Sequence, residues 1–347
     1  VTSGHYLEKE AGSAVDVRVK EKYIGELTDA DLYTFVTLKE CEFPIKIGSF
    51  TPINEGYGSA YKVARVDMYP LLVSDSKGDF THLMTNLDCE YRRDGKEVPK
   101  GQGDITGIIV HEKYERFEKN GNIGKYQIRA LSREEIAVKE DESQNSSVLL
   151  CEWTKYQGTP KGVTPTYGDG LLWQTWTSGN IYETNHFSFP GPLSPDDNKG
   201  VNRGGIAKTY WWDDNGEGQS WIIQFNTKGV KTNLLTLNLA VNNVQVGGPR
   251  NWVVETSTHG DMQGKWETVQ EYTVPDVAQW NNTLLTQMPG WKNIGFVLDL
   301  SLLDVDEAYI RLRVTRNNAG TASAYEGSTI IYSASNALYY VSVRYQK

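Results

Sequence analysis

The stretch Gly101-Gln-Gly-Asp-Ile-Thr-Gly-Ile-Ile-Val-His-Glu112, continued as far as Ile136, decides the fold of the first half of the chain. Residues 105–110 form a β-branched run behind two glycines, which predicts a buried strand. Residues 125–131 alternate apolar and polar side chains, which predicts a half-buried strand. Asn120-Gly121 between them is a hairpin signal. Ser132-Arg-Glu-Glu135 has the spacing of a capping box that opens one helical turn.

The chain upstream of this stretch predicts the other strands of the same domain. Alternating or β-branched segments predict strands over 15–24, 33–43, 69–73 and 80–86, and a Gly- and Tyr-rich excursion over 45–66. No long amphipathic helix interrupts them. Short strands, one long insertion and a closing hairpin indicate an all-β domain, a small Greek-key barrel of the OB type.

This half resembles an OB-like domain of unknown function found in surface lipoproteins of gut Gram-negative anaerobes. The resemblance covers about residues 14–138. It implies an exported protein at the cell surface or outer membrane, lipid-anchored through an N-terminal segment that has been removed, and it implies no reaction. The residues that carry it are Thr37–Phe43, Thr51–Gly56, Met84–Asn86, Tyr91–Gly95, Gly107–Glu112 and Gly124–Arg129.

Composition marks a second domain. All ten tryptophans lie between Trp153 and Trp291 of the 347 residues, and 140–147 is an acidic, wholly polar segment. We therefore expect an OB-like barrel over 1–139, a linker over 140–147 and a second domain over 148–347.

The second domain is predicted to be a jelly-roll β-sandwich. Strands are expected over 148–153, 221–225, 234–241, 252–256, 266–272, 294–298, 308–315 and 337–344, with Gly- and Asn-rich connections. This half resembles the galactose-binding-like sandwich domains. The resemblance rests on Ser220–Phe225, Pro249–Ser257, Gly264–Val269 and Tyr309–Val314.

Charge and targeting signals narrow the class of partner. Residues 1–150 carry 20 basic and 26 acidic groups, and 151–347 carry 15 and 18, so neither half is basic and we expect no nucleic-acid partner. No apolar run reaches the ~20 residues of a transmembrane helix. The chain starts at Val1 without a methionine or leader, as expected of a trimmed mature protein.

The cysteines and two acidic loops are the candidate cofactor sites. Cys41, Cys89 and Cys151 are widely spaced, which disfavours zinc and leaves open one disulfide with a free thiol or three reduced thiols. Asp196-Asp-Asn198 and the loop 213–217 could hold structural calcium, although Asx turns are the alternative. We expect no other cofactor.

No catalytic motif of a known class is present, so the protein is predicted not to be an enzyme. His111-Glu112 is the one adjacent His–carboxylate pair, and its position at a strand end favours a rim contact. His186 and His259 lie in loop contexts without an evident partner. A glycosidase carboxylate pair remains an alternative, because its spacing exists only in three dimensions.

The aromatic residues supply the candidate ligand site. Trp211 and Trp212 are adjacent, so in a strand their rings point to opposite faces and one of them should lie outside the core. An exposed ring offers sugars a flat apolar platform, and Arg250 and Asn251 follow a Gly-Gly-Pro turn as polar partners. The alternative is that the outward ring packs under the loop 186–207. Further candidates of the same type are Trp173, Trp176, Trp280 and Trp291, whereas Trp221, Trp252 and Trp266 are expected in the core.

These observations predict a non-catalytic, exported surface protein that binds glycan or another surface component through the jelly-roll. The alternatives are a structural or adhesion module without a small ligand, and a hydrolase with unrecognised carboxylates.

Overall fold

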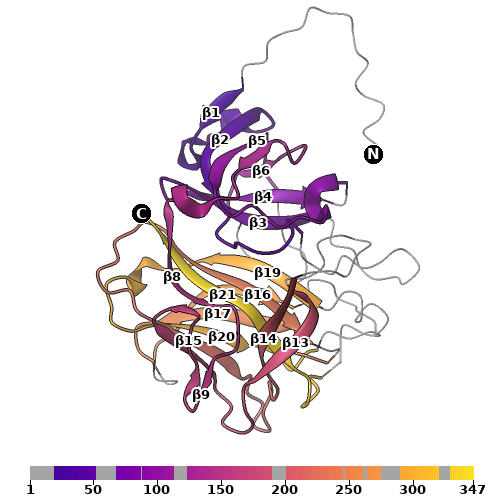
Figure 1. The fold of residues 1–347 in the computed structure, drawn as a ribbon, viewed down its shortest axis with the longest axis vertical. Coiled ribbons are helices and arrows are strands. Elements are labelled where there is room, and N and C mark those ends of the chain that lie inside the picture. The colour runs from indigo at the N-terminus through magenta and orange to yellow at the C-terminus, as the bar shows by residue number, and fades with distance from the viewer. Residues whose placement is uncertain are drawn as a thin grey trace, which may run out of the picture.

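The computed structural model describes residues 19–51, 68–86, 88–112, 123–189, 201–244, 247–260, 264–274, 290–319 and 329–347. The protein is all-β, with a small barrel packed on one sheet of a larger β-sandwich (Figure 1). The barrel is built from the first part of the chain and the sandwich from the remainder. Short 3-10 turns are η2 (Ile24–Glu26), η3 (Asp29–Asp31), η5 (Glu90–Arg93), η6 (Glu142–Gln144) and η7 (Leu300–Leu302).

The barrel has the strand order of an OB fold. Its ring runs β2-β3-β4-β6-β5 and closes through the pairing of β5 with β2. The pairing of β4 with β6 is parallel and the other ring pairings are antiparallel. The strands are β1 (Lys20–Lys22), β2 (Phe35–Glu42), β3 (Met68–Asp75), β4 (Phe80–Asn86), β5 (Gln102–Val110), β6 (Gln127–Arg129) and β7 (Ile136–Val138).

Residues 102–110 form β5 and residues 127–129 form β6, in agreement with the strands predicted from the sequence. β5 pairs with β2, β6 and β7, and Ile105 and Ile109 are fully buried in the barrel core. Glu135 accepts a hydrogen bond from the backbone N–H of Ser132 at 3.3 Å, which is half of the expected capping box. In place of the predicted helical turn there is a bend followed by a single hydrogen-bonded turn, in which the N–H of Ile136 donates to the carbonyl of Arg133 at 3.0 Å and leads into β7. The Asn120-Gly121 hairpin and residues 15–18 of the first predicted strand lie outside the described residues.

Two sheets form the sandwich. One has the order β18-β17-β20-β15-β12-β10-β9. The other contains β11-β8-β21-β14-β13, with β16 paired to β21 and β19 paired to β16. The strands are β8 (Ser147–Trp153), β9 (Gly158–Thr159), β10 (Gly162–Val163), β11 (Tyr167–Gly168), β12 (Gly170–Gln174), β13 (Tyr182–Phe189), β14 (Val201–Lys208), β15 (Ser220–Phe225), β16 (Leu235–Asn243), β17 (Asn251–Ser257), β18 (Glu267–Thr273), β19 (Gly290–Val297), β20 (Ala308–Val314) and β21 (Asn336–Gln346).

All eight strands predicted for this half are present, within a few residues at their ends. β12, β13 and β14 were not predicted, because segments that contain Gly, Asn and Trp without a regular alternation are typical of loops. Between the sheets lies one apolar core, to which β16 contributes Leu235, Leu237 and Leu239 and β15 contributes Trp221 and Ile223. The alternation of these residues along each strand is the period-2 pattern of a sandwich interior.

The barrel covers the outer face of the β21-β16-β19 layer. Ala240, Ala337 and Tyr339 belong to the same buried apolar cluster as the barrel core. β3 packs against β19, and a Cβ atom on Gly295 would come within 2.8 Å of Leu72. OB folds use this second strand of the ring as part of their ligand surface. In this protein the sandwich occupies part of that surface.

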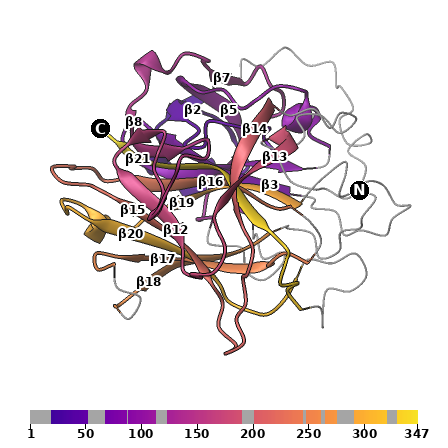
Figure 2. The same ribbon diagram turned by 60° about the horizontal axis from the view of Figure 1, so that its bottom comes forward.

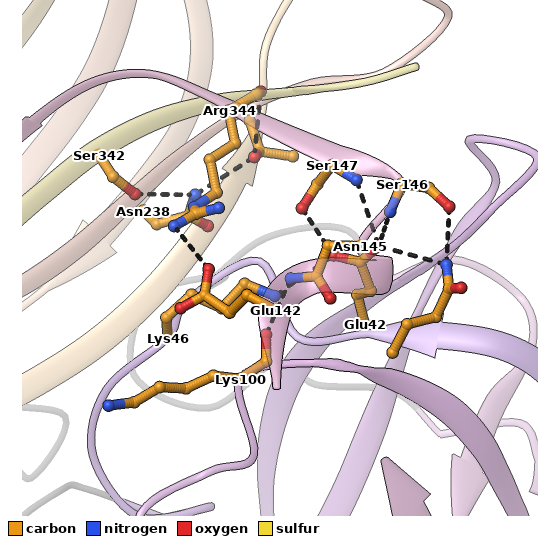
Figure 3. A network of polar contacts seen from close by, with 12 residues as sticks. Glu42, Lys46, Lys100, Glu142, Asn145, Ser146, Ser147, Asn238, Ser342 and Arg344 are labelled. Atoms are coloured by element: carbon orange, nitrogen blue, oxygen red, sulfur yellow. Dashed lines mark hydrogen bonds and ion pairs between the residues drawn. The ribbon is translucent and has the colours of Figure 1, made fainter. Parts of the chain in front are cut away.

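A buried carboxylate ties the linker to the barrel (Figure 3). Glu42 accepts hydrogen bonds from the backbone N–H groups of Ser146 and Ser147, at 2.6 and 3.2 Å, and from the Ser147 hydroxyl at 2.6 Å. Lys46 lies 3.3 Å from the same carboxylate, and both side chains are almost fully buried. Burial lowers the pKa of Lys46 to about 8, although the charge of Glu42 opposes this shift. The end of the linker is therefore fixed, while η6 within it stays exposed.

Candidate ligand-binding cleft

The paired tryptophans lie on the core side of the sandwich. Trp211 is fully buried, with ring centroids 5.2 Å from Trp221 and 5.1 Å from Trp252. Trp212 is partly buried and packs against the same core. Trp212 lies against the core rather than apart from it, and it does not form an open platform.

Arg250 and Asn251 are buried as well, with 0% and 4% of their surface exposed. The backbone explains this placement. The N–H of Arg250 donates to the carbonyl of Asn318, and its carbonyl accepts from the N–H of Val274, so the segment is hydrogen-bonded on both sides. The Gly-Gly-Pro turn therefore directs the chain into β17 and away from solvent. We correct the candidate site accordingly: Trp211, Arg250 and Asn251 are buried within the sandwich, and the four predicted residues do not share an exposed face.

A cleft lies elsewhere on the sandwich, where edges of the two sheets meet. Its volume is about 640 Å³, within the range of small-molecule sites. The β9–β10 hairpin and β12 supply one side, and the start of β13 and the end of β14 supply the other. Figure 2 shows the ribbons of β12, β13 and β14 from a second direction. Figure 1 shows β9 on the side of the sandwich opposite to the barrel. The barrel therefore does not obstruct the approach of a ligand to the cleft.

Aromatic side chains line this cleft. Trp173 belongs to β12, Trp176 follows it, and Tyr156 and Tyr182 complete the set. Leu172 points into the sandwich core, so the alternation of a strand turns Trp173 to the outer face. There its ring meets Tyr309 edge-on at 6.5 Å. Trp173 and Trp176 were among the further candidates named from sequence; Trp280 lies outside the described residues, and of Trp291 only the backbone is described.

Polar groups with remaining hydrogen-bonding capacity accompany these rings. Gln174 donates from Nε2 to the carbonyls of Thr209 and Tyr210, at 3.3 and 3.2 Å, while its Oε1 has no hydrogen-bond partner among the described protein groups. The indole Nε1 of Trp176 likewise has none. A buried acceptor and a buried donor left in this way are satisfied by water or by a ligand. Sequence reasoning missed Gln174 because β12 was not recognised.

Lys208 closes the cleft from β14. Its side chain is only 1% exposed, and Nζ donates to the carbonyl of Ser178 at 2.7 Å and to that of Gly179. Burial lowers its pKa. Gly179 has a φ of 76°, so the turn that presents these carbonyls uses a conformation that favours glycine.

An aromatic series continues from the cleft across the surface. The rings of Trp176 and Tyr210 are stacked, with centroids 6.2 Å apart and planes 16° apart. Tyr210 in turn meets Tyr332 edge-on at 3.9 Å, and Tyr332 is 62% exposed. Tyr210 has a φ of 65°, a costly conformation for a bulky residue. The backbone is thus held in a strained turn that places Tyr210 between the cleft and the exposed Tyr332.

The other candidates from the sequence do not form sites in the described residues. His111 hydrogen-bonds the carbonyl of Lys125 at 2.7 Å, whereas Glu112 pairs with Arg129 at 2.8 Å, so the two side chains do not act on one another. His259 lies beside the Thr258 hydroxyl at 3.1 Å, and the side chain of His186 is not described. No group of three or more potential metal ligands occurs within the described ranges.

The acidic loop and the cysteines have structural explanations. Asp213 accepts from the backbone N–H of Asn215 at 3.0 Å and of Glu217 at 2.8 Å, which is an Asx turn and leaves this carboxylate engaged. The second acidic loop, 196–198, lies outside the described residues. Cys41, Cys89 and Cys151 are free thiols, and burial raises the pKa of each. Within the described part of the chain, no helix has the length and apolarity needed to span a bilayer.

Comparison with known proteins gives distant structural similarities. No protein-family model matches the chain, and no curated protein matches its sequence. Among solved structures, the K1 cleaved adhesin domain of Lys-gingipain from Porphyromonas gingivalis W83 is 12% identical, with a TM-score of 0.33, covering 58% of this chain and 99% of that domain. A xylan-binding domain from Paenibacillus barcinonensis is also 12% identical, with a TM-score of 0.29, covering 58% and 96%. A Caldicellulosiruptor saccharolyticus carbohydrate-binding module crystallised with mannohexaose is 8% identical, with a TM-score of 0.29, covering 50% and 89%.

Proposed function

We propose that the protein is a non-catalytic glycan-binding protein of the cell surface, and that its sandwich domain binds an oligosaccharide in the cleft between β12 and β13. The observation that carries the proposal is the combination of Trp173 and Trp176 with a buried acceptor on Gln174 and a buried donor on Trp176 that no described protein group satisfies. Sugar rings present an apolar face and a hydroxylated edge. Aromatic walls and a few fixed polar groups match both.

The charge of the cleft favours binding over hydrolysis. Glycosidases of the usual kinds use two carboxyl groups on either side of the scissile bond. Among the described residues that line the cleft, Glu183 is the one carboxylate. We therefore assign no catalytic residue to the cleft.

We further propose that the protein lies outside the cell and is lipid-anchored at the cell surface or outer membrane. The similarity of residues 14–138 to domains of surface lipoproteins supports this. The barrel, whose ligand surface is partly covered by the sandwich, acts as the support for the glycan-binding domain.

A glycan array probed with the whole chain tests the proposal, followed by calorimetry with the best-bound oligosaccharide. Trp173→Ala and Trp176→Ala should each lower affinity by about tenfold or more, as loss of an aromatic stacking contact does. Trp266→Ala is the matched control, because Trp266 is also half-buried but lies against Arg311 near the far edge of its sheet. Failure of the array to show any bound glycan, or equal losses in all three variants, would overturn the proposal.

A further inference from the structure

Lys208 is a buried cation with no counter-ion among the described residues. Its side chain forms no ion pair with a carboxylate among the residues that the structure describes, and both of its hydrogen bonds go to neutral carbonyl groups. Taking an ammonium group out of water is costly unless it is paired. The position of Lys208 on the cleft lining therefore requires an explanation beyond the packing of β14.

The hydrogen-bonding capacity of Nζ explains the position of Lys208 on the cleft lining. An ammonium group has three N–H donors, and the carbonyls of Ser178 and Gly179 account for two of them. These two bonds fix the direction of the third donor. Since Lys208 lines the cleft, an acceptor bound there can accept a hydrogen bond from the third N–H.

The charge balance of the cleft lining also favours an anionic ligand. Lys161, on the β9–β10 hairpin, is a second cation on the lining, and Glu183 is the one opposing carboxylate. The described lining thus carries a net charge of +1, whereas the chain as a whole carries −9. A local positive charge on an acidic protein concentrates anionic ligands at that position.

From this geometry we infer that the cleft selects acidic glycans, and that Lys208 binds the anionic substituent of a sugar ring while Trp173 and Trp176 hold the ring itself. The shared chemistry is an anionic oxygen, carried either by the carboxylate of a uronic acid or by a sulfate ester. This inference rests on the proposed function and adds to it the class of ligand. Charge-assisted hydrogen bonds of this kind are about twice as strong as neutral ones.

The test uses an array in which each neutral oligosaccharide stands beside its uronic-acid counterpart and its sulfated counterpart. Acidic members should be bound in preference to their neutral counterparts, and the two acidic arms identify which anionic group is recognised. Binding confined to neutral members overturns the inference and leaves the proposed function standing. Absence of binding to every member overturns both.

Variants locate the effect at Lys208. For the best acidic and neutral pair, Lys208→Met should lower affinity for the acidic member by about tenfold or more, and Lys208→Gln, which keeps a donor without the charge, should do nearly the same. The neutral counterpart should lose less than about threefold, a difference of less than 0.7 kcal/mol. Lys228→Met is the control, because Lys228 is exposed and pairs with Asp304 outside the cleft. Thermal unfolding of each variant confirms that it folds, and equal losses for the acidic and neutral members in Lys208→Gln contradict the inference.

Discussion

The indole Nε1 of Trp211 donates a hydrogen bond to the main-chain carbonyl oxygen of Lys208, with 2.8 Å between the two atoms. Trp211 is fully buried among other rings of the sandwich core, whereas Lys208 lines the cleft. The core therefore positions one wall of the site through a single backbone contact. The sequence indicated Trp211 as a ligand contact. In the structure it instead positions Lys208, which lines the cleft.

Replacing Trp211 by Phe tests this relationship. The change keeps an aromatic ring in the core but removes the donor to Lys208, so the free energy of unfolding should fall by about 1–3 kcal/mol. Affinity for the bound oligosaccharide should also fall, by roughly three- to tenfold. Denaturant titration and calorimetry measure the two effects.

The control for Trp211 is Trp252→Phe. Trp252 is equally buried, and its Nε1 donates to the carbonyl of Pro249 at 3.0 Å, away from the cleft. It should cost similar stability and leave glycan affinity unchanged. If Trp252→Phe weakened binding as much as Trp211→Phe, the positioning role would be wrong.

Burial of His82 predicts a dependence of stability on pH. The side chain hydrogen-bonds the carbonyl of Ile123, and burial lowers its pKa from 6.5 to about 4. Between these two values the unfolded chain binds more protons than the folded one, so stability is complete above pH 6.5 and falls as the pH drops towards 4. The loss from this group is on the order of 3 kcal/mol.

Comparison of His82→Gln with the parent isolates this effect. The difference in unfolding free energy between pH 7 and pH 4, measured by urea denaturation, should be smaller in the variant. His259→Gln, at an exposed histidine, should keep the slope of the parent. An unchanged slope in His82→Gln would show that another group controls the acid sensitivity.

The Glu42 network predicts coupling between barrel and sandwich. Glu42→Gln removes the charge beside the buried Lys46 and weakens the bonds to Ser146 and Ser147, at a cost of about 3 kcal/mol. The linker should then become more sensitive to cleavage after Glu140 or Glu142 by a glutamate-specific protease. Glu21→Gln, on an exposed part of β1, is the control. Identical stability and cleavage rates in the two variants would contradict a structural role for the network.

The barrel should not bind nucleic acid. Residues 1–150 contain six more acidic than basic groups, and β3, part of the surface that OB folds use, packs against β19. Fluorescence anisotropy with labelled single-stranded DNA at physiological salt should show no saturable binding by the whole chain. Saturable binding that weakens as salt is raised would refute this.

Most of the fold could be predicted from the sequence because its signals are local. Alternation in β2 and β5, and in the strands around Trp221 and Trp252, specifies which face of each strand is buried, and tertiary packing agrees with it. β12 to β14 were missed because Trp173 and the glycines of β14 interrupt that alternation. A strand is recognisable in such a segment only once its partners are known, as when Leu172 pairs with Ile223.

The site was less predictable because it depends on contacts distant in sequence. The adjacent rings of Trp211 and Trp212 suggested an exposed platform, yet Trp211 packs inward against the rings of Trp221 and Trp252 and donates to the carbonyl of Lys208. Trp176 follows β12 of one sheet and Lys208 belongs to β14 of the other, and both line the cleft. The available signal was the grouping of Trp173 and Trp176 within four residues, outside the predicted core strands.

The most direct test of the account is fluorine NMR of the protein labelled with 5-fluorotryptophan, with each resonance assigned by substitution and then followed through titration with the best-bound oligosaccharide. The account predicts that the resonances of Trp173 and Trp176 shift with saturation, while that of Trp266 stays in place. Saturable shifts confined to Trp266 or to other tryptophans outside the cleft would show that glycan binds elsewhere, and would contradict the central claim.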